Sequence, residues 1–256
     1  MYLKTVAEIL STTPTLCIDA DLYLYRAASA AEEETNWGDD IWSLSTDLKT
    51  AKTIFTEQIE AFQKTLNVGS VMMCISSRKN HRKNYYAPYK ASRKKVRKPV
   101  GHKALVEWCT EEYPSVCIDY LEADDVMGIL ASDPAAKGKR IIVSDDKDMF
   151  TIPGKLYRPN DDSLTEVSLD EANAAFYLQS LTGDSTDGYP GLVGVGPVKA
   201  KKILGSRPDW MLVRNAYLKA GHTLEEVLAQ ARCARICRYT DYDFNKEQVI
   251  PWSPQR

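Results

Sequence analysis

The sequence lacks the features that would place it in a membrane, a disulfide framework or a zinc site. No apolar run approaches the ~20 residues that a transmembrane helix needs, and no basic segment followed by an apolar stretch opens the chain as a secretory signal would. None of the six cysteines forms a C-x-x-C pair, and the three histidines show no ligand spacing. Reduced thiols packed in a core are therefore expected. These absences favour a cytoplasmic protein without a membrane segment.

The net charge of −2 conceals a strong segregation of charge along the chain. Between Ala61 and Val106 there is no Asp or Glu, whereas twelve Lys and Arg residues occur. Blocks of like charge are usually solvated surface, but this block also contains Tyr85, Tyr86 and Tyr89. Aromatic rings among cations can stack on bases while the cations neutralise phosphates. The block therefore predicts a nucleic-acid contact on an otherwise acidic molecule.

Short apolar runs without polar alternation recur in the first 150 residues, at 16–18, 71–75, 116–118 and 141–143. Such runs are typical of strands buried on both faces of a parallel sheet. Residues 48–66 carry apolar side chains at helical spacing between the first two runs. Strands that alternate with helices predict an α/β layered domain.

The apolar runs stop near Gly183, where Gly and Pro become frequent, and a smaller helical module is predicted to begin there. Thr223 and Glu226 have the spacing of a capping box, which opens a helix that we expect to reach about Arg238. From Thr240 onward the composition is typical of a polar tail.

Carboxylates follow the predicted strands at the point where each strand ends. The segments supply, in chain order, Asp19, then Glu122 with Asp125, then Asp145, Asp146 and Asp148, and finally Asp184 with Asp187 in a turn. Ligands bind at the carboxyl edge of open α/β sheets, and residues three apart share one side of a helix. We therefore expect these acids to converge.

A converged cluster of acids would repel itself unless hard divalent cations were bound. Ligation by oxygen alone suits Mg²⁺ or Mn²⁺ rather than zinc. Two such ions ~3.5–4 Å apart can activate a water and stabilise the leaving oxygen of a phosphoryl displacement. Each motif alone is a weak signal, because Asp commonly caps helices and forms turns. Their combination predicts a two-metal site.

Residues 190–200 contain a glycine-rich loop followed by a helix that a proline opens. Glycines allow close approach of the backbone, and the free N–H groups of a helix start can bind an anion. An ordinary glycine-rich connection is the simpler interpretation of the loop alone. The lysines that follow, Lys199, Lys201 and Lys202, favour a grip on the DNA backbone.

Taken in order, these motifs resemble the 5′→3′ exonuclease and flap endonuclease family, most closely the 5′ exonucleases of short-tailed bacteriophages. The ordered set is Asp19 with Arg26, Tyr89-Lys90-x-x-Arg93, Glu122-x-Asp124-Asp125, Asp146-Lys147-Asp148, Asp184-x-x-Asp187 and the glycine loop. The resemblance implies a parallel-sheet, PIN-like nuclease core at 1–180 with a helical arch at about 78–105. A helix–three-turn–helix module, of helix-hairpin-helix type, would follow at 181–240 to grip duplex DNA, and 241–256 would be the polar tail.

The resemblance also implies residue roles. The metal-binding acids would be Asp19, Glu122, Asp124, Asp125, Asp146, Asp148, Asp184 and Asp187. The catalytic group would be Asp19, Asp125 and Asp146 with Lys90 and Arg93, whose positive charge stabilises developing negative charge at the scissile phosphate. DNA contacts are expected of Arg26, Arg82, Lys83, Tyr89, Lys90, Arg93, Gly194, Gly196, Lys199 and Lys202, with Tyr89 stacking on the terminal base. A potassium ion would be held by backbone carbonyls of Gly191, Val193 and Gly196.

One departure from the family pattern concerns the end of the second strand, where the family has an aspartate. This chain offers Ser76-Ser77 there, and alignment on the following basic residues places Ser77 at the missing acid, with Ser76 as the alternative. A hydroxyl is a weaker, neutral ligand, so we expect one metal to bind less tightly. Asp145 is an additional acid that could compensate.

The leading hypothesis is a metal-dependent 5′→3′ deoxyribonuclease with flap endonuclease potential, which acts as a monomer in phage DNA replication or recombination. Its substrates would be DNA with a free 5′ end or 5′ flap, with RNA in RNA–DNA hybrids and contacts with replication proteins as open alternatives. Two other hypotheses are a DNA-binding protein that has lost catalysis and an RNA-cutting enzyme of the small-nuclease type. Ser77 is the evidence for the former, and the glycine loop and long basic segment disfavour the latter.

Overall fold

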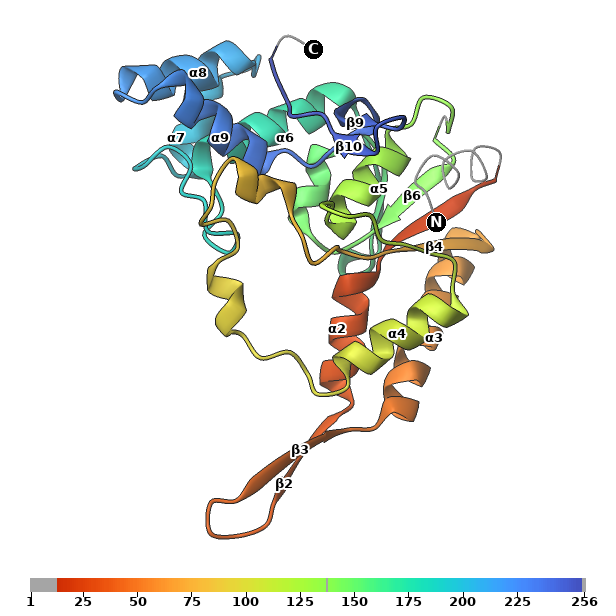
Figure 1. Cartoon of the computed structure of the whole chain (residues 1–256). Helices are drawn as coiled ribbons and strands as arrows, with labels where there is room; N and C mark the ends of the chain where they lie inside the picture. Colours follow the sequence, from red (N-terminus) through yellow and green to blue (C-terminus); the bar gives the residue numbers. More distant parts are fainter. Residues whose placement is uncertain (1–12, 137, 255–256) are drawn as a thin grey trace.

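A six-stranded sheet crosses the centre of the protein, with helices on both of its faces (Figure 1). The computed structural model describes residues 13–136 and 138–254, so the first twelve residues of the predicted core and the last two of the predicted tail lie outside it. The strands are β1 (Thr15–Asp19), β4 (Ser70–Cys74), β5 (Ser115–Val116), β6 (Arg140–Val143), β7 (Gly154–Arg158) and β8 (Ser163–Val167). Their order is β5-β4-β1-β6-β7-β8. All neighbouring pairs are parallel except β7 and β8.

The predicted α/β class is confirmed, because each of the four apolar runs contributes to a strand, β1, β4, β5 or β6, although β5 ends at Val116 and leaves out the rest of its run. Every residue of β1 is buried, which explains why its sequence has no polar alternation. The edge hairpin β7–β8 was not predicted, since β8 has exposed polar residues on both faces and gives no buried run.

Two hydrophobic cores lie on opposite faces of the sheet. Leu16 and Ile18 of β1 pack toward α2 (Ala20–Ala30), α3 (Leu48–Leu66) and α4 (His102–Glu112). Cys17 faces the other way, toward α5 (Ala123–Ala131) and the 3₁₀ helix η3 (Lys147–Thr151). Because the helices on each face cover the sheet, its carboxyl edge is left as the place where polar side chains gather.

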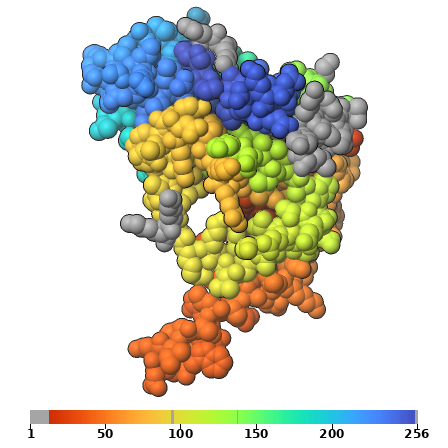
Figure 2. Space-filling view, in the orientation of Figure 1, coloured from red at the N-terminus to blue at the C-terminus, as the bar shows by residue number. Residues whose placement is uncertain are grey.

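A two-stranded hairpin of β2 (Glu32–Asn36) and β3 (Trp42–Thr46) extends away from the body of the protein (Figures 1 and 2). Near its tip Trp37, Ile41 and Trp42 are exposed. At the base of the hairpin, Glu32 accepts hydrogen bonds from Arg97 at 2.6 and 2.9 Å. These bonds attach the basic stretch of chain around Arg97 to the hairpin.

Residues 78–101, here called the bridging segment, connect the sheet to α4 and frame an opening in the space-filling view (Figure 2). The resemblance implied a helical arch, but the segment contains only two short 3₁₀ helices, η1 (His81–Asn84) and η2 (Ser92–Lys95). The absence of acids at i,i+4 leaves its cations without helix-stabilising pairs, and Pro88 interrupts any α-helix.

The helical module predicted at 181–240 contains α7 (Pro197–Leu204), α8 (Trp210–Lys219) and α9 (Leu224–Ala234). The preceding helix α6 (Leu169–Thr182), which begins before the predicted boundary, packs into the same apolar core. The capping box of Thr223 and Glu226 opens α9 as predicted, but the helix ends at Ala234 instead of reaching Arg238. Within the described residues, no helix combines the length and apolar character needed to span a bilayer.

The segment predicted as a polar tail packs against the protein. It forms the 3₁₀ helix η5 (Tyr239–Asp241) and the small strands β9 (Tyr242–Asp243) and β10 (Gln248–Val249). Trp252 makes edge-to-face contacts with Phe176 and Trp210. The scattered aromatics, rather than the polar composition, therefore decide how this end of the chain folds.

Candidate active site

A cleft of about 700 Å³ opens at the carboxyl edge of the sheet, between α2, the bridging segment and the turn that follows α6. It brings together nine of the predicted site residues, Asp19, Lys90, Arg93, Glu122, Asp124, Asp146, Asp148, Asp184 and Asp187. These residues come from segments far apart in the sequence. The predicted convergence of the strand ends therefore takes place around one hollow.

Asp19 lies at the end of β1 and caps α2, where its carboxylate accepts from the backbone N–H of Leu22 at 3.2 Å. The Ser144 hydroxyl donates to its second oxygen at 2.7 Å. The side chain is buried, and burial together with the nearby charge of Asp21 raises its pKa to about 6, although the Ser144 hydrogen bond opposes the rise. A cation beside this carboxylate would stabilise its ionised form.

Asp124, Asp146 and Asp148 face Asp19 across the same cleft. Burial and then the charge of Asp19 raise the pKa of Asp124 well above its ordinary value. Burial and then the charge of Asp146 raise the pKa of Asp148 to about 6. Among the described residues, no Lys or Arg nitrogen forms an ion pair with these four acids. The cluster thus holds mutual repulsion that bound cations would remove.

Asp184 and Asp187 lie in the turn after α6 and have cationic partners. Lys147 lies 3.5 Å from Asp184, whose carboxylate also accepts from the backbone N–H groups of Thr186 and Asp187. Although burial opposes it, these N–H groups and Lys147 lower the pKa of Asp184. The side chain of Asp187 bonds Arg93 at 2.6 Å. The carboxylate of Asp184 therefore stays ionised at neutral pH.

Lys90 and Arg93 reach the cleft from the bridging segment. Lys90 is hydrogen-bonded to Glu122 and lies 3.4 Å from Asp187. Although burial opposes it, Lys90 and then Arg82 lower the pKa of Glu122. Lys90 and Arg93 thus line the same cleft as the four acids that have no Lys or Arg ion-pair partner among the described residues. A phosphate bound in the cleft could contact both the cations and metal ions held by the acids.

Asp125 does not share this cleft, contrary to the prediction. It is 0% exposed and points into the protein, where the Arg82 guanidinium donates to both of its oxygens at 2.7 Å. Its carboxylate also accepts from the backbone N–H of Glu122, because the two residues form the capping box that opens α5. The spacing that was interpreted as a shared metal-binding face is therefore a helix cap, and Asp124 is the residue that lines the cleft.

Two predicted DNA-contacting residues are also buried. Arg82 is 2% exposed, and its guanidinium donates hydrogen bonds to Asp125, to Glu122 and to two backbone carbonyls. Tyr89 is 2% exposed, and its hydroxyl donates to Asp187 at 2.7 Å and lies 3.0 Å from a carboxylate oxygen of Glu122. Neither side chain presents a surface to DNA, so base stacking by Tyr89 and phosphate contact by Arg82 are not supported in this state.

The remaining predicted DNA contacts lie outside the cleft. Arg26 bonds Asp145 at 2.5 Å, and Lys83 is exposed on the bridging segment. Gly194, Gly196, Lys199 and Lys202 are exposed around the start of α7, where Lys199 donates to the carbonyl of Gly194 at 3.3 Å. Their roles toward DNA stay predictions, as does a potassium site formed by Gly191, Val193 and Gly196. Asp145 is held by Arg26 and does not line the cleft, so it cannot take the place of a missing acid there.

The glycine loop packs closely against the end of α6. Gly191 has a φ of +63°, and a Cβ there would lie 2.2 Å from the backbone nitrogen of Gly183. Gly194, in the same loop, also has a positive φ of +78°, but a Cβ there would meet nothing within 4 Å. The buried glycine is needed for close packing, whereas the exposed one needs only its backbone conformation.

Gly191→Ala is therefore expected to lower the free energy of unfolding by about 3 kcal/mol, since overpacking adds to the left-handed strain. Gly194→Ala, the matched control, should cost roughly 1–2 kcal/mol from strain alone. Urea unfolding of both variants measures the difference. Equal losses would show that the contact with Gly183 does not constrain the loop.

Ser76, rather than Ser77, lines the cleft at the end of β4. The Ser76 hydroxyl accepts from the backbone N–H of Ala123 at 2.9 Å, at the start of α5. Ser77 bonds outward, toward Lys79 and the exposed Asp119. Of the two serines considered for the position of the missing acid, Ser76, the alternative, is therefore the one that lines the cleft.

Other cleft residues were missed by the sequence analysis: Asp21, Leu22, Tyr25, Val96, Lys98, His102, Ala123, Lys147 and Thr186. Asp21 could have been found, since it lies two residues beyond Asp19 in the first turn of the same helix. His102 gives no such signal, because its place depends on how α4 packs beside α2.

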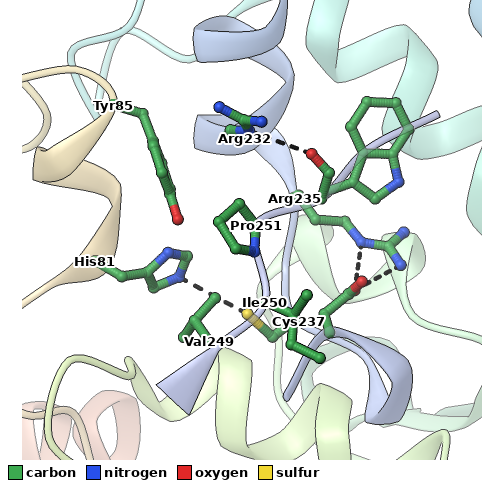
Figure 3. Close-up of a pocket in the computed structure, with 10 residues that line it drawn as sticks. His81, Tyr85, Arg232, Arg235, Cys237, Val249, Ile250 and Pro251 are labelled. Carbon is green, nitrogen blue, oxygen red and sulfur yellow. Dashed lines mark hydrogen bonds and ion pairs between the residues drawn. The ribbon is translucent and has the colours of Figure 1, made fainter. Parts of the chain in front are cut away.

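A separate group of possible metal ligands is buried behind the cleft. The ligand atoms of His81, Asp125 and Cys237 lie within 4.8 Å of one another. His81 and Cys237 also line a cavity of about 10 Å³ (Figure 3). Burial raises the pKa of the Cys237 thiol well above its ordinary value, and the Arg82 guanidinium already occupies Asp125. A neutral thiol and a neutralised carboxylate are poor ligands. We interpret this group as packing.

The cleft acids, in contrast, fit hard divalent cations. All of their side-chain donors are carboxylate oxygens, which Mg²⁺ and Mn²⁺ prefer. Burial first, and then a neighbouring carboxylate, raises the pKa values of Asp19, Asp124 and Asp148, so a bound cation would stabilise their ionised forms. The donor set and its electrostatics therefore agree with a metal site.

Comparison with known proteins places this arrangement among nucleases. Residues 14–173 match the family model described as "5′-3′ exonuclease, N-terminal resolvase-like domain". The chain is 32% identical to an exodeoxyribonuclease of Enterobacteria phage T3 over 94% of its length and 93% of the relative's. It is 31% identical to an exonuclease of Escherichia phage T7, with 93% of each chain covered. Among solved structures, the T5 D15 protein co-crystallised with metal ions aligns with a TM-score of 0.58 at 14% identity, over 87% of this chain and 85% of that one. At this identity the structural likeness concerns the fold.

Proposed function

Because the chain belongs to the 5′–3′ exonuclease family, whose members are hydrolytic nucleases, we propose that its cleft hydrolyses DNA phosphodiesters near a free 5′ end using two Mg²⁺ or Mn²⁺ ions. The observation that carries the proposal is the group of uncompensated acids, Asp19, Asp124, Asp146 and Asp148, opposite Lys90 and Arg93. When bound, the ions would supply an activated water and stabilisation of the leaving oxygen. The D15 flap endonuclease of bacteriophage T5 has been crystallised as a pseudo-enzyme-product complex with DNA and metal ions, in keeping with such a site.

The acids divide into groups by their position. Asp19 and Asp124, with Glu122 beside them, come from the end of β1 and the start of α5 and would hold one ion. Asp146 and Asp148 of the η3 start, with Asp184 and Asp187 of the turn after α6, would hold the other. Asp125 is left out of both groups. Its contribution is to hold Arg82 and the start of α5 in place.

Lys90 and Arg93 would bind the scissile phosphate. Their present partners are Glu122 and Asp187, so binding of cations by these acids would release the two side chains toward a phosphate. Fixed positive charge there stabilises the negative charge that develops during phosphoryl transfer. A water-excluding cleft increases the effect, because burial lowers the local dielectric.

DNA outside the cleft would be held by exposed basic residues. Lys83 on the bridging segment and Lys199 and Lys202 beside the glycine loop face solvent and would neutralise phosphates. The module of α6 to α9 would grip duplex DNA as a helix–three-turn–helix unit, with Gly194 and Gly196 approaching the backbone and with potassium in the glycine loop. Affinity should then fall steeply as salt rises.

The expected substrates are DNA with a free 5′ end or a 5′ flap, with RNA in RNA–DNA hybrids as an extension. The T3 and T7 relatives are phage proteins, in keeping with a phage protein that acts in the host cytoplasm. We propose that it acts there as a monomer in replication or recombination, where replication proteins would be neighbours. The competing function is DNA binding without catalysis, which the serine at the end of β4 favours.

A 5′-labelled duplex with a 5′ tail, incubated with Mg²⁺ or Mn²⁺, separates the two functions. Short 5′-phosphorylated products that disappear in excess chelator are expected, and parallel 5′-flap and RNA–DNA substrates rank the activities. Tight binding without any product would favour the binding protein. Full activity in chelator would overturn the metal mechanism.

A further inference from the structure

Asp21 lies in the first turn of α2 and lines the cleft beside Asp19. One of its carboxylate oxygens, Oδ2, accepts from the backbone N–H of Ser76 at 3.1 Å. Among the described residues, nothing donates a hydrogen bond to its other oxygen, and no Lys or Arg forms an ion pair with it. One oxygen is thus fixed in position, while the other is available to the cleft.

The other strand ends at this edge of the sheet explain why this position matters. Strand β1 ends in Asp19, and the segment after β6 supplies Asp146, but the end of β4 supplies no acid. Ser76 lies there instead, and its hydroxyl is already engaged by the N–H of Ala123. The segment after β4 therefore contributes the backbone N–H of Ser76, and this N–H donates a hydrogen bond to Asp21.

The charge of Asp21 bears on its neighbours. Asp21 lies two residues after Asp19, and both side chains line the cleft. Within the described part of the chain, no Lys or Arg forms an ion pair with either carboxylate. Placing an acid here costs stability unless a cation offsets it.

We propose that Asp21 is a metal-binding residue, whose free carboxylate oxygen replaces the acid that the end of β4 lacks. The proposal rests on the proposed function, since it assumes that the cleft binds divalent cations. The simpler role for Asp21 is to interact with the N-terminal dipole of α2, a modest stabilisation that needs no metal. The two roles differ in what removal of the charge does to metal affinity.

Asp21→Asn tests the proposal with little disturbance, because the amide oxygen can still accept from the Ser76 N–H. Calorimetric titration with Mn²⁺ in the absence of DNA should show an affinity at least about 10-fold weaker than that of the wild type. Cleavage should fall at low Mn²⁺ and recover as Mn²⁺ is raised. Asp119→Asn, which removes an exposed acid near Ser77, is the matched control and should bind Mn²⁺ like the wild type.

A second variant tests the idea of replacement. Adding Ser76→Asp to Asp21→Asn returns a carboxylate to the cleft from the end of β4, and it should recover most of the lost Mn²⁺ affinity. No recovery, in a double variant that melts like the wild type, would contradict the replacement.

Unchanged Mn²⁺ affinity in Asp21→Asn would overturn the inference while leaving the proposed function intact, provided that the wild type binds Mn²⁺ and cleaves DNA. A wild type that neither binds Mn²⁺ nor cleaves would overturn both. Loss of melting temperature in Asp21→Asn, with unchanged Mn²⁺ affinity, would assign Asp21 to the helix dipole alone.

Discussion

Asp19→Asn is expected to reduce DNA cleavage by at least about 10²- to 10³-fold, the scale of losing one preorganised electrostatic contact in an active site. Asp19 lies at the centre of the uncompensated acids, with Asp21 and Asp146 as charged neighbours. An amide would not draw a divalent cation to this position. Binding of DNA should persist, because the exposed lysines that neutralise phosphates are untouched. Cleavage and binding assays on the same 5′-tailed duplex measure the two effects.

The same substitution should not destabilise the metal-free protein. The folded protein raises the pKa of Asp19 from 3.8 to about 6, so the ionised form is less favourable in the folded state than in the unfolded state. Its cost is absent below pH 3.8, grows as the pH rises to 6 and reaches on the order of 2–3 kcal/mol above that. The neutral amide avoids this cost, and its oxygen can still cap Leu22. At about pH 7.5 without metal, Asp19→Asn should therefore melt at an equal or higher temperature.

Divalent metal should reverse this order. Mn²⁺ that binds the folded state raises the melting temperature of the wild type by mass action, and it should have much less effect on Asp19→Asn. Asp47→Asn is a suitable control, because Asp47 caps α3 in the same way but is exposed and does not line the cleft. Hydrogen bonds from Thr50 lower the pKa of Asp47, so its removal should slightly destabilise the fold and leave cleavage unchanged. Wild-type cleavage by Asp19→Asn would remove this residue from the metal site.

The part of the site that could be predicted from the sequence depends on one physical rule. Parallel strands end at the same edge of a sheet, so acids such as Asp19 and Asp146 that directly follow buried runs must come close together. The buried runs themselves are recognisable because both faces of these strands are covered. The same rule could not identify β7 and β8. Only two residues of β7 are buried, and β8 is an edge strand with three consecutive exposed residues, so neither strand shows a continuous buried run.

The helix that follows β5 shows where local patterns become ambiguous. An acid three residues after another can share a ligand-binding face or can close a capping box, and Glu122 and Asp125 do the latter. The intervening Asp124 is the residue that faces the cleft. Only the packing of α5 on the sheet decides between these alternatives, and the spacing of the acids does not contain that information.

The basic block could be recognised from the sequence, but which of its residues are buried and which are exposed could not. Arg82 is buried while Lys83, its neighbour, is exposed. The partner that draws Arg82 inward is Asp125, which lies 43 residues away in the sequence. A contact between residues so far apart in the sequence leaves no local pattern. The basic block and the family resemblance therefore assigned both residues to DNA.

Arg82→Ala is expected to lower the free energy of unfolding by about 3–5 kcal/mol, because it leaves the carboxylate of Asp125 buried without its cation. All three nitrogens of this guanidinium have acceptors: Nε donates to Cys233, Nη1 to Asp125 and Glu122, and Nη2 to Asp125 and Arg235. No N–H group is left for a phosphate. Since the arginine also joins α5 to the end of α9, its loss should lower the melting temperature by on the order of 10 °C.

Lys83→Ala separates this structural role from DNA binding. It removes an exposed cation from the next position, so it should keep wild-type stability while weakening DNA binding, most clearly at low salt. The double variant Arg82→Ala with Asp125→Ala should be less destabilised than the sum of the single variants, because no unpaired charge remains buried. It would not regain wild-type stability, since the Cys237 N–H and the Glu122 N–H, which donate to Asp125, would lose their partner. If Arg82→Ala instead melted like the wild type and bound DNA weakly, the buried pair would be dispensable and Arg82 would belong to the DNA interface.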